Sequence, residues 1–191
     1  MPVSEVLGKT AGIVSLAAFI PYILAILRGE TKPNRASWWI WSVVGCMLAA
    51  SYYSSGASHT MWVPVSYLIG PVVTALLSLK FGEGGWTRFD RWCLGGAAAS
   101  LLFWIATNEP MTALLVNLFI DFLGALPTIK KAYRDPKGED RLAWTLFVTG
   151  SVLNLLAVDR LEFAILIYPL YMLFVTGFIW VLVLRRTLAP S

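Results

Sequence analysis

Long apolar runs separated by short polar breaks form the main pattern of this chain. A membrane-spanning helix needs about 20 mostly apolar residues to cross roughly 30 Å of hydrocarbon. Seven runs approach this length, at residues 9–27, 36–56, 60–80, 90–107, 110–130, 141–158 and 163–185. The pattern therefore predicts an all-α membrane protein with seven transmembrane helices.

The composition supports this class of protein. Hydrophobic residues make up 58% of the 191 residues, charged residues make up 14%, and the mean hydropathy is +0.69. This leaves too little polar surface to cover a soluble globule. The opening residues, MPVSEVLGK, lack the basic start of a signal peptide, so we expect no cleavage. Cys46 and Cys93 lie in predicted spans without zinc-site or disulfide spacing, and we expect neither a metal nor a cofactor.

Lysine and arginine are distributed unequally between the two sides of the predicted helices. Only Lys9 and Arg160 fall on one side, and the other 13 of the 15 basic residues fall on the opposite side. Because cytoplasmic loops are enriched in Lys and Arg, this bias puts the N-terminus outside and the C-terminus in the cytoplasm. The short loops favour the bacterial inner (plasma) membrane. The net charge of +4 is spread over several loops and requires no nucleic-acid partner.

An internal repeat is visible at a constant offset of 106 positions, where Pro21, Arg35 and Trp38 match Pro127, Arg141 and Trp144. The repeating unit is three helices, and two such units can lie parallel in a membrane only if one extra span separates them. We therefore expect a first repeat at 1–80, a linker helix at 81–108 and a second repeat at 109–191. Parallel repeats normally form a pseudo-two-fold pair with a solute site between them near the midplane.

This 3+1+3 plan, with a proline near the cytoplasmic end of the first helix of each repeat, resembles the PQ-loop superfamily. That superfamily includes the SWEET sugar transporters, and at its Pro-Gln positions this chain has Pro21 with Tyr22 and Pro127 with Thr128. The resemblance implies a secondary transporter that works by alternating access, with the two prolines as hinges. Two alternatives to a SWEET-like transporter have the same arrangement of helices. One is a PnuC-like transporter of a vitamin precursor, and the other is a KDEL-receptor-like membrane receptor that binds a ligand.

Asp121 is an ionisable residue in the middle of a predicted span, about 12 Å from either end at 1.5 Å rise per residue. Asn117, Asp121, Gly124 and Thr128 recur at spacings of four, three and four, which makes one face of the helix polar or small. A carboxylate at this depth costs at least ~2.5 kcal/mol and usually has a function. It can exchange a proton and couple transport to the proton gradient, or it can balance a cationic group of the solute. An interhelical hydrogen bond, for example to Asn154, is the structural alternative.

Further candidates follow from the repeat and from residue type. Ser15 is the equivalent of Asp121 in the first repeat. Trp41 is deep enough to stack on a planar or sugar-like solute, with helix packing as the alternative. In the third helix of each repeat, where SWEETs carry sugar-binding asparagines, this chain has Tyr67 and Tyr168. Asn117 and Asn154 are either solute ligands or interhelical hydrogen-bonding groups.

Arg35 and Arg141 are expected at the cytoplasmic mouth, where they can form gate ion pairs with Glu30, Glu139 or Asp140 or extend to lipid headgroups. A retinal protein would need a lysine in its last helix to bind the retinal, and it is excluded because no lysine follows Lys137. An enzyme is disfavoured because the only histidine is His59, and no span carries an acidic pair.

The sequence thus predicts a transporter of a small polar metabolite, such as a sugar, an amino acid or a nucleoside, working as a uniporter or with protons. The lipid bilayer is its expected surrounding, and homo-oligomerisation is left open.

Overall fold

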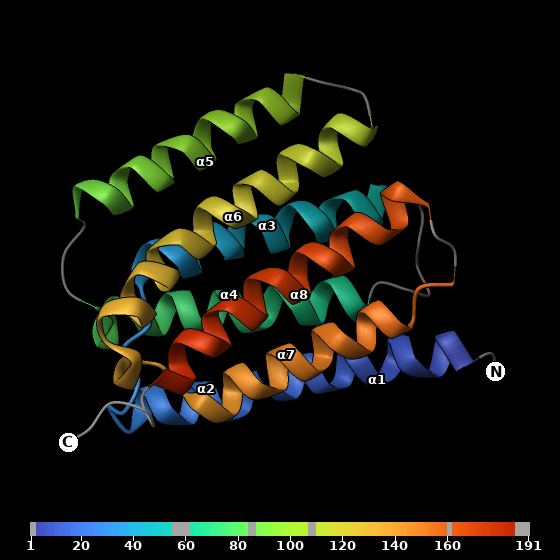
Figure 1. The fold of residues 1–191 in the computed structure, drawn as a ribbon. Helices are drawn as coiled ribbons and strands as arrows, with labels where there is room; N and C mark the ends of the chain where they lie inside the picture. The colour runs from blue at the N-terminus through green and yellow to red at the C-terminus, as the bar shows by residue number, and fades with distance from the viewer. Residues whose placement is uncertain (1–2, 55–61, 84–86, 107–109, 160–161, 186–191) are drawn as a thin grey trace. The chain divides into compact units, whose positions relative to one another are not determined.

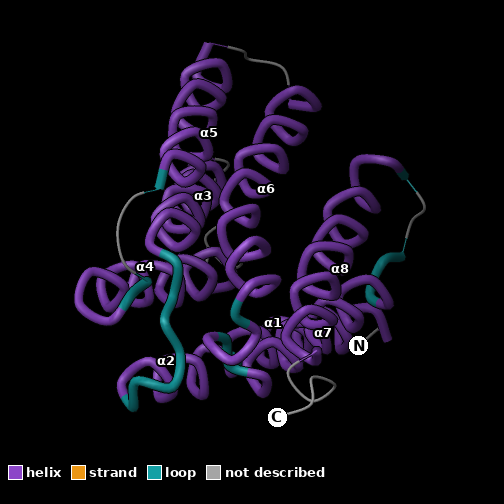
Figure 2. Tube along the Cα trace, turned by 60° about the vertical axis from the view of Figure 1, so that its left-hand side comes forward, coloured by secondary structure: helices purple, strands orange, loops and turns teal. Residues whose placement is uncertain are grey.

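The computed structural model describes residues 3–54, 62–83, 87–106, 110–159 and 162–185, which are helical apart from short connections. The elements in chain order are α1 (Val3–Ala17), α2 (Phe19–Leu27), α3 (Arg35–Ser54), α4 (Trp62–Phe81), α5 (Arg88–Ala106), α6 (Pro110–Arg134), the 3-10 turn η1 (Pro136–Gly138), α7 (Arg141–Leu156) and α8 (Phe163–Leu184). Figures 1 and 2 show these helices and the short loops between them. The predicted all-α class is confirmed for the described residues.

Two segments are long and apolar enough to cross a membrane, Val3–Leu27 and Leu166–Leu184. Leu68–Phe81 and Arg141–Leu156 are apolar but shorter. Both statements concern the length and composition of helices in the described part of the chain. The helices coincide with the seven apolar runs, while the crossing of a membrane by all seven remains a prediction.

The first predicted helix is interrupted at Ala18, between α1 and α2. Pro21 has no N–H group, so the carbonyl of Ala17 loses its helical donor, and the next bond, from Tyr22 N–H to the Ala18 carbonyl, is long at 3.4 Å. The predicted proline bend is therefore a break at this position. At its other end α2 stops at Leu27, and Gly29, just beyond the C-cap Arg28, has a φ of 74° in the left-handed region that glycine tolerates.

The chain folds into two compact units that differ from the predicted repeats. Unit 1 is Met1–Thr31 with Ile129–Ser191, and unit 2 is Lys32–Thr128. The chain passes between them twice, after Thr31 and after Thr128, and the second passage lies directly after Pro127 in α6. A packing unit and a sequence repeat need not coincide, because a helix can pack on helices of the other repeat. The repeat boundaries at 1–80, 81–108 and 109–191 stay a prediction.

In unit 1, α1 lies along α7, and α7 packs on α8 (Figure 1). Small residues allow the close approach of α1 and α7: Gly150 faces Ser15, and Gly8 faces Ala157. At the other end of this contact the rings of Phe19 and Phe147 meet edge to face, with centroids 5.0 Å apart. The first helix of the chain is thus packed against α7, which in turn packs on α8.

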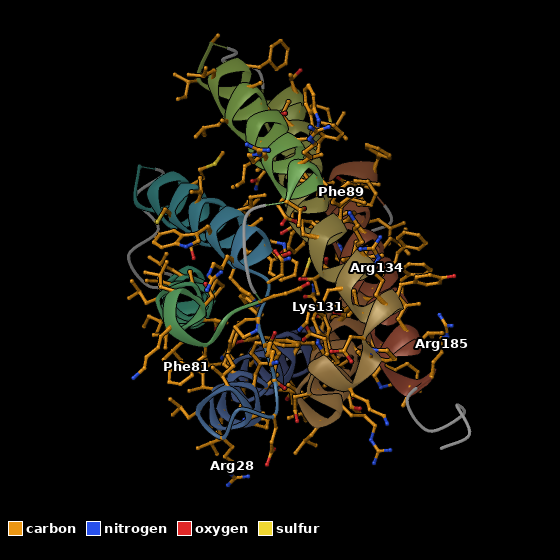
Figure 3. The ribbon with its side chains drawn as sticks, turned by 90° about the vertical axis from the view of Figure 1, so that its left-hand side faces the viewer. Arg28, Phe81, Phe89, Lys131, Arg134 and Arg185 are labelled. Carbon is orange, nitrogen blue, oxygen red and sulfur yellow. The ribbon has the colours of Figure 1, made fainter. Side chains whose placement is uncertain are left out.

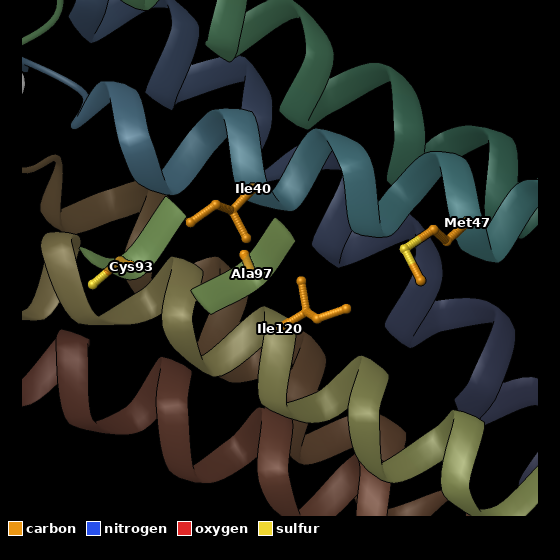
Figure 4. Close-up of a cluster of buried hydrophobic side chains, with 5 residues drawn as sticks. All are labelled: Ile40, Met47, Cys93, Ala97 and Ile120. Carbon is orange, nitrogen blue, oxygen red and sulfur yellow. The ribbon is translucent and has the colours of Figure 1, made fainter. Parts of the chain in front are cut away.

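In unit 2, α3 packs on α4 and α5. Its core is a cluster of buried side chains from α3, α5 and α6, namely Ile40, Met47, Cys93, Ala97 and Ile120 (Figure 4). Cys93 is 3% exposed and acts as a packing residue, as expected, whereas Cys46 is exposed. This core holds α3 and the N-terminal part of α6 together, and these two helices carry the candidate site.

Candidate functional site

Trp41 on α3 is seated on α6 at the level of Asp121. Its indole Nε1 donates a hydrogen bond to the backbone carbonyl of Asp121 at 3.2 Å. The ring can lie this close because residue 124 is glycine: a Cβ there would be 2.9 Å from Cγ2 of Ile40 and 3.1 Å from Cδ1 of Trp41. The small residue in the predicted stripe therefore makes room for the tryptophan.

A second tryptophan supports the first. The rings of Trp38 and Trp41 meet edge to face with centroids 4.9 Å apart. Trp38 is 2% exposed and therefore forms part of the packing, whereas Trp41 is only half-buried. The arrangement fixes the orientation of the Trp41 ring and leaves part of its surface uncovered.

The acidic and amide groups of the stripe lie on the same face of α6 as this contact. Asp121 and Asn117 are half-buried, one helical turn apart, and Gly124 is buried. Oδ1 of Asn117 is buried and has no hydrogen-bond partner among the described residues. A buried acceptor without a donor costs about 1–3 kcal/mol, so a group that brings a donor to this position would be stabilised there.

The hinge candidate Pro127 lies one turn beyond Gly124, and α6 stays helical across it. The N–H of Thr128 donates to the hydroxyl of Ser37 at 3.1 Å, and the two hydroxyl oxygens are 2.7 Å apart. These bonds tie the turn that follows Pro127 to α3. The other hinge candidate, Pro21, belongs to unit 1 and interrupts its helix instead.

The two gate candidates have different surroundings. Arg35 donates from Nε to the Ser78 carbonyl at 2.9 Å and from Nη1 to the Glu83 carbonyl at 2.8 Å. A third bond, from Nη2 to the Leu79 carbonyl, is 3.3 Å long, so Arg35 supplies donors to carbonyls in and just after the last turn of α4, where helical donors run out. Arg141 is exposed, and Glu139, one of the expected ion-pair partners, is bonded to Lys131.

The remaining candidates are not part of the group around Trp41. Ser15, Asn154 and Tyr168 belong to unit 1. Ser15 is 7% exposed and lies against Gly150, where it takes part in the packing of α1 on α7, while Asn154 and Tyr168 are half-buried. The side chain of Tyr67 lies outside the described residues. The structure thus places Trp41 against the backbone of Asp121, with Asn117 one turn before it on α6.

One cluster of polar side chains was not anticipated as a unit. Lys131, Glu139, Tyr22 and Trp144 form a buried hydrogen-bonded network in unit 1. A signal for it exists in the sequence, because Lys131 continues the stripe of Asn117 to Thr128 by a further step of three. Among the described residues, no three His, Cys, Asp or Glu side chains are placed to hold a metal ion.

Comparisons with protein-family models, with curated proteins and with solved structures found no match to this chain.

Proposed function

We propose that this protein is an integral membrane transporter of a small polar solute, with its solute site on the stripe of α6 next to Trp41. Large apolar side chains on several helices support a lipid environment. Ile20, Leu102 and Phe174 are each more than 60% exposed, at 63%, 69% and 66%. Such side chains are compatible with contact to acyl chains, and exposed apolar surface of this kind is rare on soluble monomers. The seven apolar helices cross the bilayer in this proposal, with the N-terminus outside.

The observation that carries the proposal is the set of groups on the face of α6 that Trp41 contacts. A half-buried carboxylate and an amide oxygen that has no partner among the described residues lie one turn apart on α6, and the partly uncovered indole ring is bonded to the backbone of the same carboxylate residue. Both side chains accept hydrogen bonds. The site therefore suits a solute that brings hydrogen-bond donors and a flat or apolar face, and it does not suit an anion. An anionic peptide tail, the ligand class of a KDEL-receptor-like protein, is disfavoured for the same reason.

The internal repeat is supported by matching helix starts. Asn34 Oδ1 accepts from the N–H of Ser37 at 3.2 Å, and Asp140 Oδ1 accepts from the N–H of Ala143 at 2.7 Å. These two N-terminal caps are separated by the same offset as the repeated Pro, Arg and Trp residues. In this proposal each compact unit combines the first helix of one repeat with the second and third helices of the other.

A second candidate within the same class is a PnuC-like transporter of a vitamin precursor. The edge-to-face pair of Trp38 and Trp41 favours it, because an oriented indole can stack on a planar ring. A sugar would instead rely on more numerous hydrogen bonds. Asp121 fits both solutes, either as a partner of donor groups or as a proton carrier.

The test is the thermal stability of the purified protein in detergent with a panel of sugars, amino acids, nucleosides and amines, compared with Asp121→Asn and Trp41→Phe. A ligand at about 100 times its Kd adds roughly 2.7 kcal/mol to stability. The exposed Asp159 provides a matched control, Asp159→Asn. We expect a compound that stabilises wild type and the control but neither site variant.

Uptake of the same compound into vesicles loaded with a pH-sensitive dye then separates proton coupling from uniport. Acidification of the lumen during uptake, lost in Asp121→Asn, assigns the carboxylate to proton coupling. Uptake without acidification assigns it to solute binding. If Asp121→Asn and Trp41→Phe both behave as wild type with each stabilising compound, the site is wrong.

A further inference from the structure

Glu139 is the centre of the buried network in unit 1. Its Oε1 accepts from Nζ of Lys131 at 2.6 Å, and its Oε2 accepts from the hydroxyl of Tyr22 and from Nε1 of Trp144, both at 2.9 Å. Lys131 donates a further bond to the Gly138 carbonyl at 2.7 Å. One carboxylate thus connects α2, α6 and α7, with both of its oxygens used.

The ion pair is fully withdrawn from water. Glu139 is 0% exposed and Lys131 is 5% exposed, while Arg28 and Arg185, basic residues of the same unit, are exposed and extend outward (Figure 3). Burying two charges has a large desolvation cost that a close pair offsets only when its other hydrogen bonds are made, as they are here. Loss of either partner leaves an uncompensated buried charge, so the network is either complete or strongly disfavoured.

Along the chain, the network residues Tyr22 and Lys131 lie close to the two passages between the units. Tyr22 directly follows Pro21 on α2, and unit 1 is left after Thr31. Lys131 lies four residues after Pro127 on α6, and unit 1 is entered again at Ile129. Each passage therefore has a proline and a residue bonded to Glu139 within a few turns along the chain. Pro21 and Tyr22 precede the first passage, while Pro127 precedes and Lys131 follows the second.

The corresponding end of unit 2 is held differently. There Arg35 binds backbone carbonyls of Ser78, Leu79 and Glu83, and the Pro33 carbonyl accepts from the N–H of Glu83 at 2.9 Å. Backbone carbonyls cannot change their charge, and they hold α3 and α4 as one piece. The ion pair in unit 1 instead depends on two charged side chains, and replacement of either one leaves the other charge buried without its partner.

We propose that the Lys131–Glu139 pair is a clamp that holds the two passage segments, residues 28–34 and 126–134, in one conformation, and that its opening releases both together. In a transporter, on which this part of the inference rests, opening of the clamp accompanies the change of access. The clamp itself is a property of unit 1 and can be measured without a solute.

The experiment is hydrogen–deuterium exchange of the full chain in detergent, comparing wild type with Glu139→Gln and Tyr22→Phe. Glutamine keeps an acceptor for Tyr22 and Trp144 but removes the charge that faces Lys131. We expect exchange at residues 28–34 and 126–134 to rise together by at least about tenfold in Glu139→Gln, with exchange in α3 and α7 unchanged. Tyr22→Phe, which leaves the ion pair in place, should raise exchange in 28–34 more than in 126–134.

The exposed pair of Lys9 and Glu5, with a similar distance of 2.8 Å, provides the control, since Glu5→Gln should change neither segment. The double variant Lys131→Met with Glu139→Gln removes both charges and should be closer to wild type than Lys131→Met alone. A uniform rise over all of unit 1, or no rise in the two segments, would overturn the clamp.

Solute uptake by the same variants keeps the two proposals apart. A coupled rise in exchange with no uptake of any solute by wild type supports the clamp and refutes transport. Unchanged exchange with normal wild-type uptake refutes the clamp and leaves transport standing.

Discussion

Gly124→Ala places a methyl group in the space that Trp41 and Ile40 occupy. The added Cβ would lie 2.9 Å from Cγ2 of Ile40 and 3.1 Å from both Cδ1 and Nε1 of Trp41. These are the side-chain contacts that keep the indole against the Asp121 carbonyl. The substitution on α6 therefore tests whether Trp41 of α3 lies against residue 124, while the tryptophan itself is unchanged.

Two opposing effects set the magnitude. Overpacking of a core typically costs about 1–3 kcal/mol, because neighbouring side chains must leave their preferred positions. Replacing glycine by alanine inside a helix contributes up to about 1 kcal/mol in favour of the helix. The expected net change in the free energy of unfolding is a loss of about 0–2 kcal/mol.

Gly95→Ala is the matched control in the same unit. Gly95 is an exposed glycine of α5, and a Cβ there would have nothing within 4 Å. It reports the helix effect alone, so its difference from Gly124→Ala isolates the crowding, about 1–3 kcal/mol. With about 2–4 °C per kcal/mol for a chain of this size, Tm of the two variants should differ by about 2–12 °C.

The assay is thermal unfolding in detergent followed by near-ultraviolet circular dichroism, which reports the environment of the tryptophans. A stabilising solute, once found, should also lose its effect in Gly124→Ala and keep it in Gly95→Ala. If the two variants shift Tm equally and bind alike, Trp41 is not seated on Gly124, and the geometry of the candidate site is wrong.

Three further outcomes follow from individual contacts. Arg35→Met removes the donors to the carbonyls that end α4 and should raise hydrogen exchange there, whereas Arg141→Met, at an exposed side chain, should leave the helix ends unchanged. Asp140→Ala removes the N-cap of α7 and should lower the free energy of unfolding by about 1 kcal/mol, measured by chemical unfolding. Asp140→Asn should stay close to wild type, and equal stability of the Ala and Asn variants would contradict a capping role for Asp140. Gly29→Ala forces a side chain into a φ of 74° and should lower the free energy of unfolding by about 1–2 kcal/mol. Gly12→Ala, where a Cβ has open space, should cause no loss, and chemical unfolding of the two variants checks the difference.

The helical class and the approximate helix positions could be predicted from the sequence, because apolar runs of this length leave few other conformations that satisfy the backbone. The helix boundaries were predicted less well. The first apolar run begins at residue 9, but α1 begins at Val3; the fifth apolar run ends at residue 130, but α6 continues to Arg134. Helical hydrogen bonds continue into polar flanks such as Glu5 and Lys131, which an apolar count does not register.

The two repeated prolines show where local reasoning stops. Both Pro21 and Pro127 remove a helical donor, yet α1 and α2 separate at the first, while α6 remains continuous at the second. At the second position the hydroxyl of Ser37 accepts from the Thr128 N–H and ties this turn of α6 to α3. This partner comes from a helix ninety-one positions away, as the sequence separation of the two residues shows, and no local pattern contains it.

The candidate site divides in the same way. The spacing of Asn117, Asp121 and Gly124 determines that they share a face of one helix, since 3.6 residues make a turn. The tertiary structure alone decided that Trp41 covers that face and that Lys131 pairs with Glu139. Periodicity identifies a polar or small face but not the helix that packs on it, because most apolar helix faces are compatible with one another. The specific partners are selected by close approaches at glycines and by buried charges that must be matched.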